Sequence, residues 1–567
     1  MPTPPSSLPS SPAALAGADW PALQPYFDEL AERPLDDPET WLRDWSELEK
    51  LVGEAAALAE IAYTTNTGSA AKEQAHLRWS SEIAPQADEQ QVRLAERLVE
   101  RGYVPQGLEV TVRSFRNRIE LFKKENVPLL AEEARDRAAY QRLAGQMLAD
   151  WEGERLPVPQ VEAKMLEPDR IVRERAYRSA IQPYVAAREE LATIFDRLLR
   201  VRQAIAANAG FGNFRDYQHQ AYGRFDYTPD DCLRWHDAVE EVVVPARERS
   251  LQRRQAALGV DRLRPWDLAV DPRRRPPLRP FTEASELIGG VRSLFQHLAG
   301  ELGAEFSLLA DEQLLDLDSR PGKAPGGYCA PLPHRRRNFI FMNAAGTQHD
   351  VFTLLHESGH AFHSFAAGRL PYVWQDQYPM EIAEVASMSM ELLGGPGLAR
   401  ARGGFYDDAA DVARARAENL ESVLAMLCHI ATVDAFQHWL YTNPEGADKE
   451  ARDARWLELR ARFEPLVDFE GLRTERAARW HRQLHIFDMP FYYIEYGLAQ
   501  LGALQVWRNS LRDPAEALAR YRSMLALGNT RPLPELFGAA GARLVFDAEG
   551  MRELVQLVEE ELARLEG

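Results

Sequence analysis

The stretch from Thr347 to Gly368, TQHDVFTLLHESGHAFHSFAAG, constrains this chain more than any other part of it. It predicts a long amphipathic α-helix, because apolar residues recur at three- and four-residue spacing, Thr347 and Asp350 can form a capping box, and a glycine marks the end. Since an α-helix advances about 100° per residue, His356 and His360 lie one turn apart on the same face. The fold must therefore present two imidazoles side by side on an apolar helix.

These two histidines belong to the pentapeptide HESGH, which fits the HExxH pattern of zinc enzymes: two imidazoles for Zn²⁺ and Glu357 as the general base. The pattern also occurs by chance on ordinary polar helix faces. Apolar flanks favour the metal hypothesis, because a preorganised metal site needs rigid, dry support. A metzincin would carry a third histidine ten residues after His356, where this chain has Ala366, so that class is excluded.

A third metal ligand has to come from another element, because a catalytic zinc site takes three protein ligands and keeps one position open. The segment from Pro379 to Leu393, PMEIAEVASMSMELL, predicts the next helix, with Gly-Gly-Pro directly after it. It offers three carboxylates. Glu384 and Glu391 share a face two turns apart, and Glu381 lies about 60° away. Spacing alone does not choose among the three.

HESGHAFHSF followed by EIAEVASMSMELL resembles the thimet oligopeptidase and oligoendopeptidase F family of zinc peptidases, in which HExGH is followed by a ligand glutamate in an E-(A/V)-x-S segment. The segment EVAS, beginning at Glu384, matches. The resemblance implies one Zn²⁺ per chain, bound by His356, His360 and Glu384. It also implies that Glu381 and Glu391 accept hydrogen bonds from the ligand imidazoles, as metal-bound histidines generally require.

A second chemical cluster follows far downstream, in HIFDMPFYYIEY from His485 to Tyr496. An aromatic stripe at helical spacing is normally part of a core. However, a carbonyl under attack develops negative charge, which a Tyr hydroxyl or a His N–H can stabilise. In the family that the chain resembles, a histidine is followed by two tyrosines three residues apart, and the run FYYIEYG is similar to the bacterial oligoendopeptidase branch. The resemblance implies this role for Tyr496, with Tyr493 or His485.

One β element is predicted just before the zinc helix, in GGYCAPLPHRRRNFIFMN from Gly326 to Asn343. Its short apolar run is flanked by glycines and prolines. Zincins commonly hold an edge strand beside the metal, and an extended peptide adds to it through main-chain hydrogen bonds. The residues predicted to bind substrate in this way are Phe339, Ile340, Phe341 and Met342.

The fold class predicted for the chain is mainly α, because the segment from Trp20 to about Glu190 reads as successive amphipathic helices. The resemblance implies a two-lobed helical ellipsoid with a deep central channel and a small β-sheet beside the HExxH helix. We predict a disordered Pro/Ser-rich tail at residues 1–18, an N-terminal helical lobe at 19–190 and a catalytic zinc peptidase region at 191–567.

The composition limits the binding partners and the cellular compartment that we expect for this protein. A net charge of −19 argues against nucleic acid or an anionic membrane as the main partner. Three scattered cysteines without a CxxC pair fit a reducing cytosol. The start lacks the basic and apolar regions of a signal peptide, and the apolar run from Val423 to Phe436 is too short to span a bilayer. We predict a cytoplasmic protein outside the membrane; the sequence carries no signal for its oligomeric state.

The resulting hypothesis is a zinc-dependent endopeptidase that hydrolyses internal bonds of short oligopeptides in intracellular peptide turnover. Two alternatives remain open. A zinc carboxypeptidase on a related helical fold would need a cationic clamp for the substrate C-terminus. A non-catalytic peptide-binding protein would be credible if a ligand or Glu357 were missing, and none is.

Overall fold

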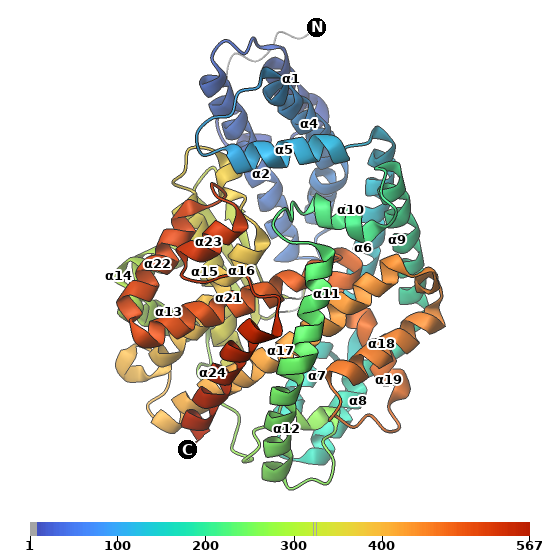
Figure 1. The fold of residues 1–567 in the computed structure, drawn as a ribbon, viewed down its shortest axis with the longest axis vertical. Coiled ribbons are helices and arrows are strands. Elements are labelled where there is room, and N and C mark those ends of the chain that lie inside the picture. Colours follow the sequence, from blue (N-terminus) through green and yellow to red (C-terminus); the bar gives the residue numbers. More distant parts are fainter. Residues whose placement is uncertain (1–7, 321, 325, 567) are drawn as a thin grey trace. The chain divides into compact units, whose positions relative to one another are not determined.

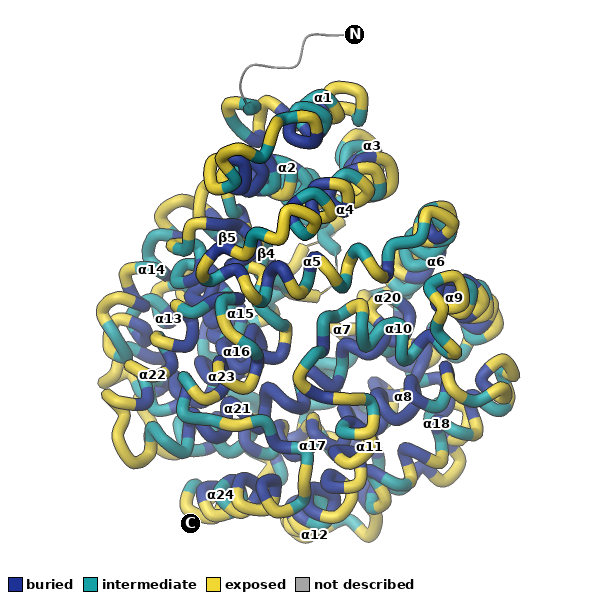
Figure 2. Tube along the Cα trace, turned by 45° about the horizontal axis from the view of Figure 1, so that its top comes forward, coloured by how far each residue is buried: buried dark blue, intermediate teal, exposed yellow. Residues whose placement is uncertain are grey.

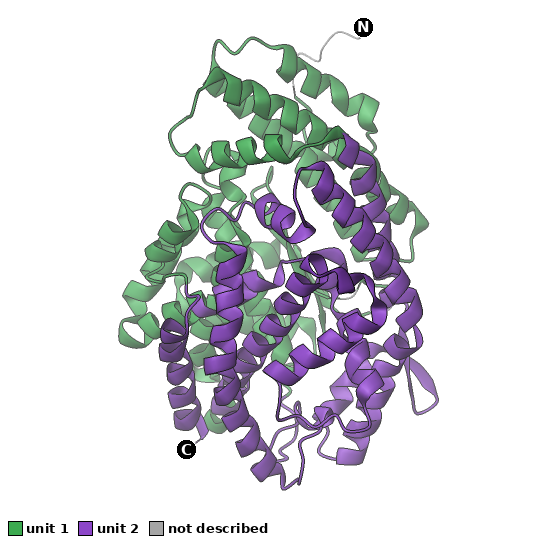
Figure 3. Ribbon diagram, turned by 45° about the vertical axis from the view of Figure 1, so that its right-hand side comes forward, with its two compact units in different colours: residues 1–124, 279–412, 502–544 green, residues 125–278, 413–501, 545–567 purple. Residues whose placement is uncertain are grey.

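The computed structural model describes residues 8–320, 322–324 and 326–566, and these are mainly helical with two small sheets (Figure 1), which confirms the predicted fold class. The chain divides into two compact units (Figure 3). Unit 1 comprises residues 1–124, 279–412 and 502–544; unit 2 comprises residues 125–278, 413–501 and 545–567. The functional division of the sequence at residues 190 and 191 stays a prediction. The two-lobed shape and its channel stay predictions.

Unit 1 contains the predicted zinc helix, the larger sheet and the N-terminal helices. Its elements are α1 (Trp20–Glu32), α2 (Pro38–Thr64), α3 (Ala70–Leu77), α4 (Ala84–Arg101), α5 (Glu109–Leu121), α13 (Ala284–Leu298), α14 (Gly300–Asp311), β3 (Leu315–Asp318), β4 (Tyr328–Leu332), β5 (Arg337–Ala344), α15 (Gln348–Ala367), α16 (Met380–Gly394), α22 (Pro514–Leu527) and α23 (Leu533–Ala539). Residues 1–7 of the predicted tail lie outside the described residues. Of the rest, Pro12–Leu15 form a 3-10 helix in which Leu15 is buried.

An aromatic cluster joins the N-terminal helices of unit 1 to the loop that follows α15. The ring of Trp374 lies 4.5 Å from that of Trp45 on α2 and 5.3 Å from that of Phe115 on α5. The Ser46 hydroxyl accepts a hydrogen bond of 2.8 Å from the Val373 amide. Since aromatic pairs at these distances add to the burial of large apolar surfaces, the cluster fixes the end of α15 against the N-terminal helices.

The three-stranded sheet of unit 1 corrects the prediction for residues 339–342. Its order is β3-β5-β4, with β5 parallel to β3 and antiparallel to β4. Strand β5, which contains Phe339 to Met342, is therefore central, and its Ile340 and Phe341 pair with both neighbours. A run that is apolar on both faces fits a fully buried strand, and Ile340 and Phe341 are 0% exposed. A substrate cannot add to this strand. Within the described residues, β4 is an edge.

The described residues of unit 2 form helices and one β-hairpin, joined by loops. Its elements are α6 (Val127–Gly145), β1 (Leu148–Trp151), β2 (Glu154–Pro157), α7 (Val158–Glu162), α8 (Arg170–Ala186), α9 (Arg188–Asn208), α10 (Phe214–Ala221), α11 (Pro229–Ala238), α12 (Val244–Leu258), α18 (Lys449–Phe463), α19 (Arg473–Ala478), α20 (Leu484–Asp488), α24 (Ala548–Glu566), most of α17 (Ala409–Thr442) and the start of α21 (Tyr493–Arg512).

The long helix α17 belongs mostly to unit 2, and much of it is buried (Figure 2). Among the described residues it is the one helix that is long and apolar enough to cross a membrane by length and composition, and 78% of its most apolar window is buried inside the protein. Such burial is typical of a core helix. The predicted apolar run from Val423 to Phe436 lies within it.

Candidate active site

Helix α15 begins and ends where the sequence predicted. The Thr347 hydroxyl accepts a hydrogen bond of 3.3 Å from the Asp350 amide, and the Asp350 carboxylate accepts one of 2.8 Å from the Thr347 amide. This reciprocal capping box satisfies two backbone donors at the helix N-terminus, and Gly368 caps the other end. The helix therefore starts at a fixed residue, which determines the direction in which each of its side chains points.

The two helices α15 and α16 approach each other closely at Gly359, the glycine of HESGH. A β-carbon added there would lie 2.5 Å from Ser387 Cα and 2.7 Å from the Ala386 carbonyl oxygen, both backbone atoms of α16. Because real β-carbons essentially never approach so closely, only glycine allows this spacing. Sequence reasoning missed this role, although the glycine stands between the two histidines.

Close packing brings three potential metal ligands together. Glu384 Oε2 on α16 lies 3.3 Å from His356 Nε2 and 3.5 Å from His360 Nε2. One ligand atom from each residue lies within 4.8 Å of the others. Two atoms bound to one ion at roughly 2.0–2.1 Å in tetrahedral geometry would stand at about such a separation. The donor set therefore fits a single divalent cation. The two imidazoles are 19% and 18% exposed, which leaves a side open for water.

Neighbouring polar groups hold two of these side chains in place. Glu391 Oε1 lies 2.8 Å from His356 Nδ1, on the side of the ring that faces away from Glu384. The Ser387 hydroxyl donates a hydrogen bond of 2.9 Å to Glu384 Oε2. Glu381, the other carboxylate singled out from the sequence, is buried in the first turn of α16. Contacts such as those of Glu391 and Ser387 orient metal ligands, and a carboxylate beside a ligand histidine raises the basicity of the imidazole.

The carboxylates in this cluster favour a positive charge between them: although burial acts to lower the pKa of His356, Glu384 and Glu391 raise it well above its usual value. Burial alone would raise the pKa of Glu384, but the neighbouring His360 and His356, together with the Ser387 hydroxyl, lower it to about 2. Burial lowers the pKa of His360 to about 4. At neutral pH the carboxylate is therefore ionised and this imidazole is neutral, which are the forms that bind a metal.

Glu357 lies on α15 between the two histidines and is 7% exposed. Burial, with a smaller contribution from the nearby Glu384 and Glu391 charges, raises its pKa to about 7, whereas His356 acts in the opposite direction. A carboxyl group with a pKa near neutrality can take up and release a proton at physiological pH. Such a perturbed carboxyl beside a metal-ligand set is typical of a catalytic base.

The N-terminal end of strand β4 lies beside the Glu357 carboxylate. A β-carbon on Gly327, the residue before the strand, would stand 3.8 Å from Glu357 Oε1 and 3.3 Å from the Phe341 carbonyl oxygen. Farther along the strand, burial first and the Glu357 charge second raise the pKa of Cys329 well above its usual value. The edge strand β4 thus lies beside Glu357. The glycine pair at residues 326–327 was the sequence signal for this close approach.

A further contact that the sequence did not indicate supports α16 from behind. The Tyr521 hydroxyl, on the buried face of α22, donates a hydrogen bond of 2.9 Å to the Ala386 carbonyl oxygen. That carbonyl is one of the atoms that meet Gly359. The bond keeps α16 pressed against α15, yet no local pattern relates residue 521 to residue 386.

The predicted oxyanion residues lie together in unit 2. The His485 ring is 4.8 Å from the Tyr493 ring and 5.8 Å from the Tyr496 ring, and the two tyrosine rings are 5.4 Å apart. The three side chains are partly exposed, whereas Phe491 and Tyr492 beside them are buried. Gln483 Nε2 lies 2.9 Å from His485 Nδ1. The segment therefore has one partly accessible polar face and one core face.

Backbone contacts fix the turn that leads into these tyrosines. The backbone of Phe491 has a φ of 66°, which lies in the left-handed region that residues other than glycine rarely adopt. Its amide donates a hydrogen bond of 2.8 Å to Gln437 on α17, and its carbonyl accepts one from Arg224. Arg224 also pairs with Glu495 at 2.7 Å. The surrounding side chains hold the strained residue in place, as strained residues at functional sites generally require.

A mainly helical chain with an HExxH helix, a carboxylate from the following helix and a buried glutamate between the histidines has the residue set that is typical of the HExxH class of metal-dependent hydrolases. Within that class the family is shown directly: Peptidase family M3 matches residues 164–556. The chain therefore belongs to peptidase family M3, whose members are metallopeptidases.

Individual relatives agree with this family. The chain is 26% identical over 235 residues to the chromosomal oligoendopeptidase F of Lactococcus lactis subsp. cremoris and to the group B oligopeptidase PepB of Streptococcus agalactiae. Each alignment covers 40% of this chain and 36% of the relative, so the matched part spans little more than a third of these curated proteins. Among solved structures, PZ peptidase A with a bound inhibitor superposes with a TM-score of 0.91 at 26% identity, covering 96% of this chain and 98% of that one. The oligoendopeptidase-F of Enterococcus faecium, at 17% identity and a TM-score of 0.62 over 96% of this chain and 97% of that one, shares the fold.

Proposed function

We propose that the protein is a zinc-dependent endopeptidase that hydrolyses internal bonds of short peptides. The observation that carries the proposal is the arrangement of His356, His360 and Glu384 around one point, with the raised-pKa carboxyl of Glu357 in the same helix turn. Membership of peptidase family M3 supports it. The imidazole and carboxylate donors suit Zn²⁺, and the partly exposed histidines leave a position for water.

When bound, zinc would polarise the substrate carbonyl and lower the pKa of its water ligand. The chain's own residues do the rest of the work. Glu357 takes a proton from the attacking water and then delivers it to the leaving amine. Glu391 and Ser387 hold the ligands His356 and Glu384 in fixed positions, so that little reorganisation is needed during the reaction.

Tyr496 is proposed to donate a hydrogen bond to the oxygen that gains negative charge, with Tyr493 or His485 as the second donor. These groups belong to unit 2 and the proposed metal ligands to unit 1, so the proposal rests on the His and Tyr pattern and on the clustering of the three rings. The cost of removing such a donor is about 10²-fold to 10³-fold in kcat.

The substrate is proposed to lie along β4. An edge strand offers free main-chain groups to an extended peptide, and the start of β4 lies beside Glu357. Backbone recognition of this kind suits short peptides of varied sequence. We further propose a cytoplasmic location, because none of the three cysteines forms a disulfide among the described residues and the sequence carries a large negative charge.

The proposal is tested by metal analysis together with mass spectrometry of products from a peptide ladder of about five to twenty residues. We expect about one zinc ion at this site per chain, reversible loss of hydrolysis on chelation, and internal cleavage of peptides whose C-terminus is amidated. Casein should be cut far more slowly per bond than a ten-residue peptide. Cleavage confined to free C-termini would instead identify a carboxypeptidase, and equal rates on casein would overturn the preference for short peptides.

A further inference from the structure

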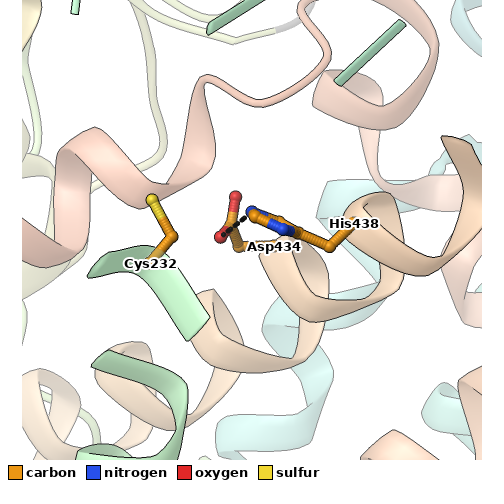
Figure 4. A group of neighbouring side chains, drawn as sticks. All are labelled: Cys232, Asp434 and His438. Atoms are coloured by element: carbon orange, nitrogen blue, oxygen red, sulfur yellow. Dashed lines mark ion pairs between the residues drawn. The ribbon is translucent and has the colours of Figure 1, made fainter. Parts of the chain in front are cut away.

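A second group of potential metal ligands lies in unit 2, outside the site described above. Helix α11 carries Cys232 and His236, and α17 carries Asp434 and His438. The two residues of each pair are four positions apart in the sequence, so each helix presents its two side chains on one face. Figure 4 shows the side chains of Cys232, Asp434 and His438 converging from these two helices. One ligand atom of each lies within 4.8 Å of the others, as in the first site.

This cluster is sealed from solvent. Cys232, His236, Asp434 and His438 are 1%, 2%, 0% and 5% exposed. A carboxylate is costly to bury unless other groups compensate its charge. Here the imidazoles of His236 and His438 lie against the Asp434 carboxylate. A carboxylate, two imidazoles and a thiol therefore share one sealed interior, and all of them are side chains that can bind zinc.

Hydrogen bonds within the cluster leave ligand atoms unused. His236 Nε2 lies 2.8 Å from Asp434 Oδ2, and His438 Nε2 lies 3.3 Å from the same oxygen. Asp434 Oδ1 and His438 Nδ1, both buried, have no hydrogen-bond partner in the described part of the chain. Because buried polar atoms are almost always satisfied, two orphaned atoms beside a cysteine sulfur point to a ligand.

We propose that this cluster binds a second divalent cation of the zinc type through Cys232 Sγ, the Asp434 carboxylate and an imidazole nitrogen of His438. His236 donates a hydrogen bond to Asp434 and orients it, as Glu391 orients His356 in the first site. A thiolate with an imidazole selects zinc over magnesium or calcium, which prefer oxygen ligands. The burial of all four side chains leaves no path for a substrate, so the ion would support the fold and would not catalyse a reaction.

The ion would join α11 to α17, and both helices contact the segment that carries the predicted oxyanion donors, residues 485–497. Gln437, the residue before His438, accepts the hydrogen bond from the strained Phe491 amide. The His438 ring itself lies 5.6 Å from the Phe491 ring. On the other helix, Trp235 meets α21 so closely that a β-carbon on Gly497 would stand 2.5 Å from its ring. A cation that joins α11 to α17 would therefore fix the helix that carries Tyr493 and Tyr496.

Cobalt substitution tests this proposal, because a thiolate ligand gives Co²⁺ an intense sulfur-to-metal charge-transfer band in the near ultraviolet. The proposed first site contains no sulfur ligand. The full chain is produced in cobalt-supplemented minimal medium, so that a sealed site fills during folding. We expect the band in the wild type and in the double variant His356→Ala/His360→Ala. Total metal should fall from two equivalents per chain in the wild type to one in the double variant.

The band should disappear in Cys232→Ser and persist in Cys428→Ser, a matched change at a buried cysteine on α17, and in Cys329→Ser. A double variant that is folded by circular dichroism but holds no metal and shows no band would overturn the proposal. So would a band that depends on Cys329 or Cys428. Since the double variant leaves the second cluster intact, its metal content and its band test the proposal even if Cys232→Ser fails to fold. Failure of the first site would instead leave the band and abolish hydrolysis.

Discussion

Two pairs of helices in this protein present histidines and a carboxylate to one point, and they differ in access. In the pair α15 and α16 both imidazoles are about one fifth exposed, and a carboxyl with a pKa of about 7 lies beside them. In the pair α11 and α17 the corresponding side chains are at most 5% exposed, and the carboxylate has a lowered pKa. Access to solvent therefore separates the site that we propose to be catalytic from the one that we propose to stabilise the fold.

The two sites also differ in how the helices come together. At the first, Gly359 removes a side chain so that α16 approaches to backbone contact, and Tyr521 supports α16 from behind. At the second, the close approach is made by Gly497 against Trp235, one helix away from the ligands. Backbone contact directly at the ligands fixes their spacing, as a site that must keep its geometry through repeated turnovers requires.

The largest expected effect comes from Glu357→Gln, which keeps the side-chain shape and removes the base. General base catalysis is worth roughly 10²-fold to 10⁴-fold, so kcat should fall by about that factor while the metal content stays at the wild-type value. The measurement pairs steady-state hydrolysis of a ten-residue peptide with metal analysis. Glu549→Gln, an exposed change in the first turn of α24, should leave both quantities unchanged. Wild-type turnover by Glu357→Gln would assign the base to another residue.

Tyr496→Phe asks whether a residue of unit 2 serves the chemistry proposed for unit 1. Since its hydroxyl is needed only when charge has developed on the carbonyl oxygen, kcat should fall by about 10²-fold to 10³-fold with little change in KM. Tyr493→Phe, made in parallel, shows which hydroxyl contributes more. A rise in KM alone would place Tyr496 in ground-state binding, and no effect would return the aromatic cluster to a packing role.

Gly359→Ala tests the claim that backbone contact sets the first site. The added methyl group would meet backbone atoms at 2.5 and 2.7 Å, so α15 and α16 must separate. Overpacking of this kind costs about 1–3 kcal/mol, which should lower Tm and weaken metal binding at the first site only. Gly289→Ala, in α13 with nothing within 4 Å, is the matched control and should not be destabilising. Equal Tm values for the two variants would show that the helices are not in contact as described.

Helix α15 could be predicted from the sequence because all of its signals are local. The capping box, the HExxH pair and the final glycine lie within a single helix, and the structure contains the helix at the predicted bounds. Sheet order is not local. An apolar run before the helix predicted a strand, yet whether that strand lies at an edge depends on β3, which pairs with it from more than twenty residues away. The prediction that Phe339 to Met342 form the edge was wrong for this reason.

The second cluster escaped prediction for a related reason. Cys232 and His236, like Asp434 and His438, are four residues apart, but each pair alone is an ordinary feature of a buried helix. Only tertiary packing of α11 on α17 brings the pairs together, over a separation of about two hundred residues. Glu384 would have been equally ambiguous among three carboxylates without the resemblance of EVAS to a known motif.

The pH dependence of hydrolysis distinguishes the carboxyls of the two sites. Because the Glu357 pKa is raised to about 7 without metal and a bound cation would lower it, the acid limb of kcat/KM should have a midpoint between about 4.3 and about 7. Activity should rise with pH through this midpoint, as the base loses its proton. Asp434, with its low pKa, should contribute no limb in this range. Asp376→Asn, at another acid whose pKa burial raises to about 8, should leave the midpoint in place. A limb that moves with Asp376 would assign the titration to that residue.

The smallest expected effect tests how far the first site depends on the groups around its ligands. Ser387→Ala removes the hydroxyl that donates to Glu384 Oε2 at 2.9 Å, so the carboxylate can rotate away from the shared point. Loss of such a supporting contact typically weakens metal binding by about tenfold to a hundredfold, and we expect the lower end because the helix still positions the residue. Competition with a chelator of known affinity measures the change. Ser389→Ala is the control on the same helix, since its buried hydroxyl has no hydrogen-bond partner among the described residues and its loss should leave the affinity unchanged. Equal affinities for both variants would mean that helix packing alone orients Glu384, and the first site would then resemble the second cluster in depending on the fold for its geometry.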